Sequence, residues 1–198
     1  MINNFQQIAS LLQFDSEDEF YFLQLIKRKK ENPELGSNNI VCYSYYINSS
    51  EHLLNLEREI IALCELNNAR AYINLNRCSY EKVAFQTLKN VVDRIMNKDF
   101  RSVKRAYNTC CGQFNIENPK KWIIDIDKDP SQMETALLVA HIQEFIRELK
   151  PEGLKSIALI PTKNGYHFIT TPFNMQQFKE KYPEIDVHKN NPTILYCI

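Results

Sequence analysis

Hydrophobic and polar positions recur along the chain with different periods, and these periods predict its elements. In the first 110 residues, apolar positions at helical spacing predict helix over residues 1–30. β-Branched and aromatic residues predict strands at Ile40–Ile47 and 71–76. A helix capped by Ser49 or Ser50 follows the first strand, and a helix opened by Ser79 follows the second, with another over 99–110. The pattern therefore predicts a helical start and then strand–helix–strand–helix.

The second half of the chain has a different order of elements. Gly, Asn and Pro concentrate in residues 112–120, which predicts a linker. The pattern then predicts, in order, a strand over 121–127, a helix over 131–149, strands over 156–160 and 166–170, a helix over 174–181 and a strand over 191–198. The turn Asn164-Gly165 between two apolar runs predicts a tight hairpin with positive φ at its two central residues.

The order β-α-β-β-α-β is that of a ferredoxin-like, or RRM-like, unit. We therefore predict an α+β fold, in which an N-terminal helical and α/β unit (1–111) packs on a ferredoxin-like sheet (121–198). The two units are expected to form one compact domain, because 198 residues suit a single core.

Composition excludes several classes of protein. Hydrophobic residues make up 44% and charged residues 24%, which argues against disorder, collagen and coiled coil. No apolar run approaches the ~20 residues of a membrane span, and the N-terminal residues do not resemble a signal peptide. The six cysteines form no CxxC pair, which favours reduced structural thiols over a zinc site. We expect a soluble, cytoplasmic protein that does not contact a membrane.

The formal net charge of +0 excludes a general nucleic-acid coat protein, which would need a large basic excess. Any contact with nucleic acid must therefore come from a local patch. The best candidate is the basic stretch that contains Lys98, Arg101, Lys104 and Arg105. A solvated helix face is the alternative interpretation of these residues.

Four polar residues are expected to meet at one end of the predicted ferredoxin-like sheet. Asp125 and Asp127 lie two apart on its first strand, so both project from one face. The third strand is predicted to run antiparallel beside the first, which brings His167 to the same end. Asp186, just before the fourth strand, is expected at the same edge. Taken singly, each residue also fits a solvated turn, a polar strand position or an ordinary loop.

Carboxylates gathered in this way suit Mg²⁺ or Mn²⁺, which prefer oxygen ligands and complete their shell with phosphate and water. Two such ions can activate an attacking hydroxyl and stabilise the leaving oxygen of a phosphoryl transfer. An imidazole at 167 and the nearby Lys163 are suited to hold a triphosphate. The residues therefore predict nucleotidyl transfer.

Three short segments resemble motifs of the archaeo-eukaryotic primase superfamily, in the family's order. Trp122–Asp127 resembles its first motif, an apolar strand ending in Asp-x-Asp; residues 162–167 resemble its second, a hydroxyl residue, Gly and then His; and Ile185-Asp186 resembles its third. The resemblance covers about residues 70–198. It implies a primase or primase-polymerase, which builds or extends DNA or RNA on a single-stranded template from nucleoside triphosphates.

The resemblance also implies roles for individual residues. Asp125, Asp127 and Asp186 would carry the Mg²⁺ or Mn²⁺ ions, and His167, Lys163 and Thr162 would hold the incoming triphosphate. Arg70 and Arg77, which flank the strand at 72–76, are further candidates to contact the nucleotide or the template.

The chain also departs from the family. Nothing in 168–185 fits the zinc-binding insertion that many members carry, and the chain is short for a self-sufficient primase. This predicts a minimal catalytic domain, encoded by a phage or mobile element, that works with a helicase or other replication proteins. Two alternatives stay open: a non-catalytic module of the same fold that binds single-stranded nucleic acid or a replication partner, and a metal-dependent phosphodiesterase.

Overall fold

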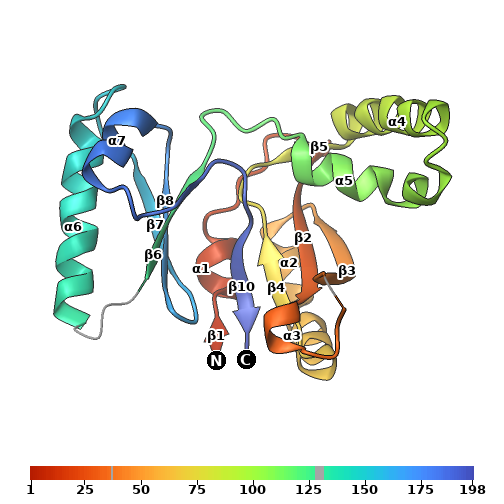
Figure 1. Cartoon of the computed structure of the whole chain (residues 1–198), viewed down its shortest axis with the longest axis horizontal. Coiled ribbons are helices and arrows are strands. Elements are labelled where there is room, and N and C mark those ends of the chain that lie inside the picture. The colour runs from red at the N-terminus through yellow and green to blue at the C-terminus, as the bar shows by residue number, and fades with distance from the viewer. Residues whose placement is uncertain (37, 128–131) are drawn as a thin grey trace.

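The protein is a mixed α+β structure with two antiparallel sheets (Figure 1). The computed structural model describes residues 1–36, 38–127 and 132–198, with side chains described for all of these except 132–134. Within that part of the chain, no helix combines the length and the apolar character needed to cross a bilayer.

The first sheet holds strands from both ends of the chain. Its order is β1-β10-β4-β2-β3, with β5 pairing to β2. The strands are β1 (Ile2–Asn3), β2 (Glu19–Lys27), β3 (Ile40–Ile47), β4 (Arg70–Ile73), β5 (Cys78–Ser79) and β10 (Thr193–Cys197). The 3-10 helix η1 (Lys29–Glu31) follows β2, and helices α1 (Phe5–Ala9), α2 (Ser50–Asn55) and α3 (Glu57–Asn67) pack on the sheet. Ser49 caps α2 by accepting a hydrogen bond from the His52 backbone N–H, one of the two caps predicted.

The predicted helix over residues 1–30 is confirmed only at α1 and is wrong elsewhere, above all at 19–27, which form β2. This strand lies between β4 and β3, and its first five residues are all buried. Leu23 and Leu25 enter the main core, whereas Phe20 and Phe22 pack in a second cluster with Cys78. A strand covered on both faces has a nearly continuous apolar sequence, so it shows no period of two and is easily mistaken for a helix.

The second sheet has the order β7-β8-β6-β9, and all neighbouring strands are antiparallel. Its strands are β6 (Trp122–Asp127), β7 (Ser156–Pro161), β8 (Gly165–Thr170) and β9 (Val187–His188). Helices α6 (Gln132–Glu148) and α7 (Met175–Lys181) cover one face, where Ile124 and Ile126 are buried (Figure 1). Ile123, Ile160 and Ile169 belong instead to the core of the first sheet. Alternate residues of β6 therefore serve different cores.

The terminal strand predicted over 191–198 exists as β10, but it lies in the first sheet, between β1 and β4. β9 takes the place beside β6 that the sequence pattern assigned to the terminal strand. All five residues of β10 are buried, because a strand in the interior of the larger sheet is covered on both faces. The Asn4 side-chain amide joins the sheets by donating to the carbonyls of Pro161 (2.9 Å) and Ile194 (3.0 Å).

A helical hairpin projects from the first sheet on the side away from the second (Figure 1). It consists of α4 (Tyr80–Met96), the 3-10 helix η2 (Phe100–Arg105) and α5 (Ala106–Gln113). Ser79 caps α4 as predicted, accepting a hydrogen bond from the Lys82 backbone N–H. Residues 114–121, with neither helix nor strand, then lead to β6.

The hairpin turn between β7 and β8 differs from the prediction. Among the described residues, positive φ occurs at Asn68, Lys98 and Gly153, so neither Asn164 nor Gly165 adopts it. The Thr162 backbone N–H closes the turn by donating to the Gly165 carbonyl at 2.9 Å. Glycine is needed at 165 because a Cβ there would collide with the Ile126 carbonyl of β6. The close approach of two strands, rather than the turn type, explains this glycine.

We expect Gly165→Ala to lower the free energy of unfolding by about 2–3 kcal/mol, because the added methyl group forces backbone apart rather than a flexible side chain. Urea denaturation measures the loss. Gly112→Ala is the matched control, because a Cβ at that helical position meets nothing within 4 Å and alanine favours helix. Equal stability of the two variants would contradict the close approach.

Candidate functional site

Asp125 lies at the centre of the candidate site, between residues of two neighbouring strands. On one side it pairs in register with His167 of β8. On the other, its backbone N–H donates to the Asp186 carbonyl at 2.9 Å, just before β9. His167 Nε2 lies 3.8 Å from Asp125 Oδ1. The structure thus places Asp125 beside His167 and the backbone of Asp186, three residues from separate segments.

The two other carboxylates differ in position. Asp127 is the exposed last residue of β6 and pairs in register with Gly165. It lies two residues beyond Asp125, hence on the same side of the strand. The Asp186 carboxylate is largely exposed, and its Oδ1 lies 3.7 Å from Lys179 Nζ of α7. The backbone of Asp186 is therefore at the site, while its side chain is directed to a lysine.

His167 links the site to the first sheet. Its Nδ1 lies 2.8 Å from Oγ1 of Thr193, a buried residue at the start of β10. Burial lowers the pKa of His167 below its ordinary value, the Asp125 carboxylate opposes this, and His188 adds to the lowering. The imidazole is therefore neutral at neutral pH. Sequence reasoning missed Thr193 and His188, because it placed Thr193 in the wrong sheet and no local motif marks His188.

The lowered pKa of His167 makes stability depend on pH. Because the folded-state pKa lies below 6.5, protonation favours the unfolded state. Stability is expected to fall as pH drops below 6.5 through the folded-state pKa, and His167→Gln should flatten this part of the profile. Urea denaturation between pH 5 and 8 measures it. His141→Gln, at an exposed position of α6, is the control; a profile unchanged by His167→Gln would contradict the burial of a neutral imidazole.

The carboxylates also decide what metal site is available. Among the described residues, no three carboxylate, imidazole or thiolate side chains lie close enough together to hold an ion by themselves. Asp125 and Asp127 nevertheless offer hard oxygen donors on one strand face, and Mg²⁺ is commonly held by one or two carboxylates plus substrate phosphates. The donor set therefore fits a divalent ion that arrives with a triphosphate. Asp186 can join it only by leaving Lys179.

Two predicted nucleotide-binding residues share a cavity. Arg70 and Lys163 line about 290 Å³ of space, together with Glu31, Asn68, Ala69 and Ile198. Lys163 Nζ donates to the Ile198 carbonyl at 3.3 Å, and Arg70 Nε donates to Glu31 Oε2 at 2.9 Å. Lys163 belongs to the β7–β8 turn, next to the register pair of Asp127 and Gly165. Thr162 lies in the same turn, where its backbone N–H bonds Gly165.

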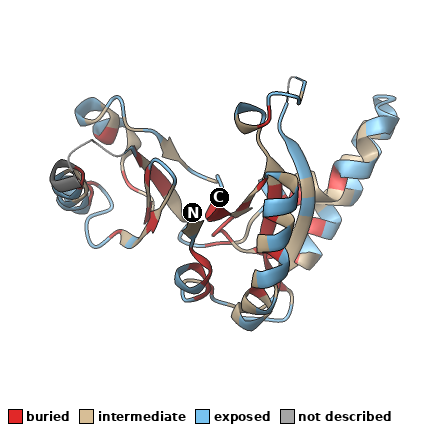
Figure 2. Cartoon of the chain, turned by 90° about the horizontal axis from the view of Figure 1, so that it is seen from below, coloured by how far each residue is buried: buried red, intermediate tan, exposed pale blue. Residues whose placement is uncertain are grey.

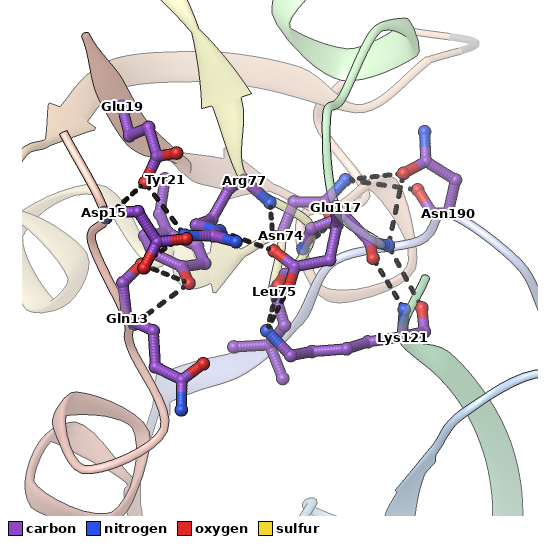
Figure 3. A network of polar contacts seen from close by, with 11 residues as sticks. Gln13, Asp15, Glu19, Tyr21, Asn74, Leu75, Arg77, Glu117, Lys121 and Asn190 are labelled. Atoms are coloured by element: carbon purple, nitrogen blue, oxygen red, sulfur yellow. Dashed lines mark hydrogen bonds and ion pairs between the residues drawn. The ribbon is translucent and has the colours of Figure 1, made fainter. Parts of the chain in front are cut away.

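Arg77 lies in a different, mostly buried network (Figure 3). Its guanidinium contacts Asp15 at 2.6 Å, Glu19 at 2.8 Å and Glu117 at 3.1 Å. Glu117 also lies 3.2 Å from Lys121 Nζ. Burial lowers the pKa of Arg77, but these carboxylates outweigh it and raise the pKa overall. The network connects the start of β5 to the segment before β6. No local sequence pattern predicted it.

The predicted nucleic-acid-binding residues lie away from Asp125. Lys98 follows α4, and Arg101, Lys104 and Arg105 belong to η2. This end of the hairpin lies across the first sheet from the second (Figure 1). The structure therefore does not bring the basic stretch to the carboxylates.

Comparison of the chain with models of protein families, with curated proteins and with solved structures found no match. A functional assignment therefore depends on the geometry of the site and on the motif resemblance.

Proposed function

We propose that this protein is a metal-dependent nucleotidyltransferase that builds or extends a DNA or RNA strand on a single-stranded template, like the primases and primase-polymerases it resembles. The observation that carries the proposal is the arrangement of four polar residues around β6 in the second sheet. Asp125 pairs in register with His167 and donates its backbone N–H to the Asp186 carbonyl, and Asp127 follows at the strand end. These are the residues that the three motifs supply.

The architecture supports a ferredoxin-like arrangement of the second unit. The strand order β7-β8-β6-β9 is that of a β-α-β-β-α-β unit with its first and third strands central, and α6 and α7 lie on one face. In this proposal β9 is the fourth strand. The unit then ends near residue 188, and β10 returns to the first sheet.

The proposed reaction is a displacement of pyrophosphate at the α-phosphorus. The oxygen of a strand's 3′-hydroxyl attacks the α-phosphorus of a nucleoside triphosphate, a new P–O bond forms, and the bond to pyrophosphate breaks. The hydroxyl proton passes to water. A bound Mg²⁺ or Mn²⁺, held by Asp125 and Asp127, would supply a lowered hydroxyl pKa and charge neutralisation.

The chain's own residues bind and orient the substrate. With Nδ1 accepting from the Thr193 hydroxyl, the neutral His167 carries its proton on Nε2 and donates it in a hydrogen bond to a phosphate oxygen. The cavity beside the β7–β8 turn offers the charges of Lys163 and Arg70 to the phosphates. Glu31 offsets Arg70, so Lys163 contributes more of the attraction.

Incubation with labelled deoxynucleoside or nucleoside triphosphates, Mn²⁺ or Mg²⁺ and a single-stranded template, with and without a primer, tests the proposal. We expect template-dependent products on a gel, and the primer requirement separates extension from priming. Failure to incorporate nucleotide under every combination would overturn the proposal. Binding of the template without synthesis would favour the non-catalytic module, and hydrolysis of a phosphodiester without synthesis would favour the phosphodiesterase.

A further inference from the structure

Helix α4 turns a stripe of large apolar side chains to solvent. The stripe comprises Phe85, Leu88, Val92, Ile95 and Met96, all exposed. Their spacing places them on one face of the helix. Phe85 is 67% and Met96 75% exposed, and Phe100 of η2, also exposed, follows the helix. Figure 2 shows this hairpin as mostly exposed or intermediate along its length. A stripe of this extent on a projecting helix is typical of an interaction site.

Beyond Val83, which is buried against α5, the side of α4 that faces its own hairpin is polar. Arg94 donates from Nε to Asn90 Oδ1 and from Nη1 to the Ser102 carbonyl, both at 2.6 Å. Thr87, on the same side, donates to the carbonyl of Val83. Beyond Val83, the usual amphipathic arrangement is thus inverted, because the hairpin satisfies polar side chains and leaves the apolar stripe uncovered.

A cavity lies at the base of the stripe. It measures about 200 Å³ and is lined by Phe85, Phe114, Ile116 and Lys82, together with Ser79, Gln86 and Asn115. A mostly apolar hollow suits one large apolar side chain; Asp18 partly offsets Lys82 at its edge, so a preference for an acidic segment must come from the net charge of the hairpin. Such an anchor in a pocket is the usual centre of a protein interface.

The charge of the hairpin favours an acidic partner. Residues 80–113 contain seven basic and three acidic residues, whereas the whole chain has 24 of each. A second copy would bring the same positive hairpin against this one. Single-stranded nucleic acid matches the charge, and Phe85 and Phe100 offer rings for stacking, but between them the stripe is the aliphatic run Leu88, Val92 and Ile95, which suits apolar side chains better than bases. A fluid bilayer matches the stripe but needs no shaped cavity.

We propose that the α4 stripe is the docking surface for an acidic amphipathic helix of a partner protein, which inserts one large apolar side chain into the cavity at the base of the stripe. Apolar side chains of the two helices pack together, and Lys82 and Lys89 face acidic residues of the partner. Helix α4 lies across the first sheet from β6, the strand that carries Asp125, so the proposal does not depend on strand synthesis (Figure 1).

A synthetic peptide of about 20 residues, long enough for several helical turns, is the probe. It carries Leu at heptad core positions, one central Trp, and Glu elsewhere. Fluorescence anisotropy with the full chain is expected to give a Kd on the order of 10 µM, weakened by salt. Binding should weaken at least tenfold when the peptide is scrambled or its Trp is replaced by Ala. The protein variant with Leu88→Ser and Val92→Ser should weaken it as much.

The matched control replaces Leu66 and Leu154, two exposed leucines elsewhere, by Ser and should bind as the unaltered protein does. Equal binding of the scrambled peptide, or of a Lys-for-Glu version, would overturn the proposal; the peptide changes give this result even if the α4 variant misfolds. Three other results would also overturn the proposal, if each is lost when Leu88 and Val92 are replaced by Ser. They are dimer formation in sedimentation velocity, co-sedimentation with phosphatidylglycerol vesicles, and binding of oligo(dT).

Discussion

Asp125→Asn is expected to reduce template-dependent strand synthesis by about 10³-fold or more. The substitution keeps the shape of the side chain but removes the negative charge that would hold the divalent ion. A bound ion contributes several kcal/mol of transition-state stabilisation, and each 1.36 kcal/mol corresponds to about tenfold in rate. The backbone hydrogen bond from residue 125 to Asp186 is unaffected, so the fold should persist. Single-nucleotide incorporation and thermal unfolding of one preparation measure both.

Asp93→Asn, at an exposed position of α4, is the matched control and should leave synthesis unchanged. Asp127→Asn is expected to act like Asp125→Asn, since both carboxylates lie on one strand face. Full activity of Asp125→Asn in a folded protein would show that the candidate site around Asp125 is not catalytic.

Arg77→Met is expected to lower the free energy of unfolding by about 3–5 kcal/mol, because it leaves the buried Glu19 carboxylate without its cation and removes one of the two cations of Glu117. The side chains of Arg77, Glu19 and Glu117 are 11%, 9% and 6% exposed. For a chain of this size the loss corresponds to a fall in Tm of roughly 6–20 °C. Adding Glu19→Gln should recover part of the loss by removing the carboxylate left without a cation, since Glu117 keeps its ion pair with Lys121.

The control for Arg77 is Lys27→Met, which removes an ion pair with the exposed Glu34 and should cost under about 1 kcal/mol. The same measurement separates two roles for Arg77. The sequence proposed that it binds nucleotide, which predicts unchanged stability and a raised KM for nucleotide. A large loss of stability would instead show that Arg77 is a structural residue, whose ion pairs hold the start of β5 against the segment before β6.

Local patterns predicted most elements well. Strand β6 and helix α7 lie where the sequence pattern indicated, and Ser79 opens α4. These features depend on side-chain alternation and on hydrogen bonds within a few residues, so they can be read without knowing the partners. β2 was misread for the opposite reason, since its sequence reflects cover on both faces by distant elements.

The candidate site shows the same division. Asp125, Asp127 and His167 were predicted from motif spacing and strand direction, and the register of β6 with β8 brings Asp125 and His167 together. The orientation of the Asp186 carboxylate toward Lys179 could not be predicted, because it depends on where α7 packs. Thr193 was beyond reach as well, because its role requires that β10 leave one sheet for the other.

The sequence by itself determined the α+β character, the positions of most strands and caps, and the carboxylates and histidine of the candidate site. The tertiary structure decided which strands pair, that Arg77 is surrounded by three carboxylates, and that α4 turns its apolar side outward. The physical reason is the range of the interactions. Periodicity and capping act within a few residues, whereas strand pairing, burial of charge and helix orientation depend on contacts between segments far apart in the chain.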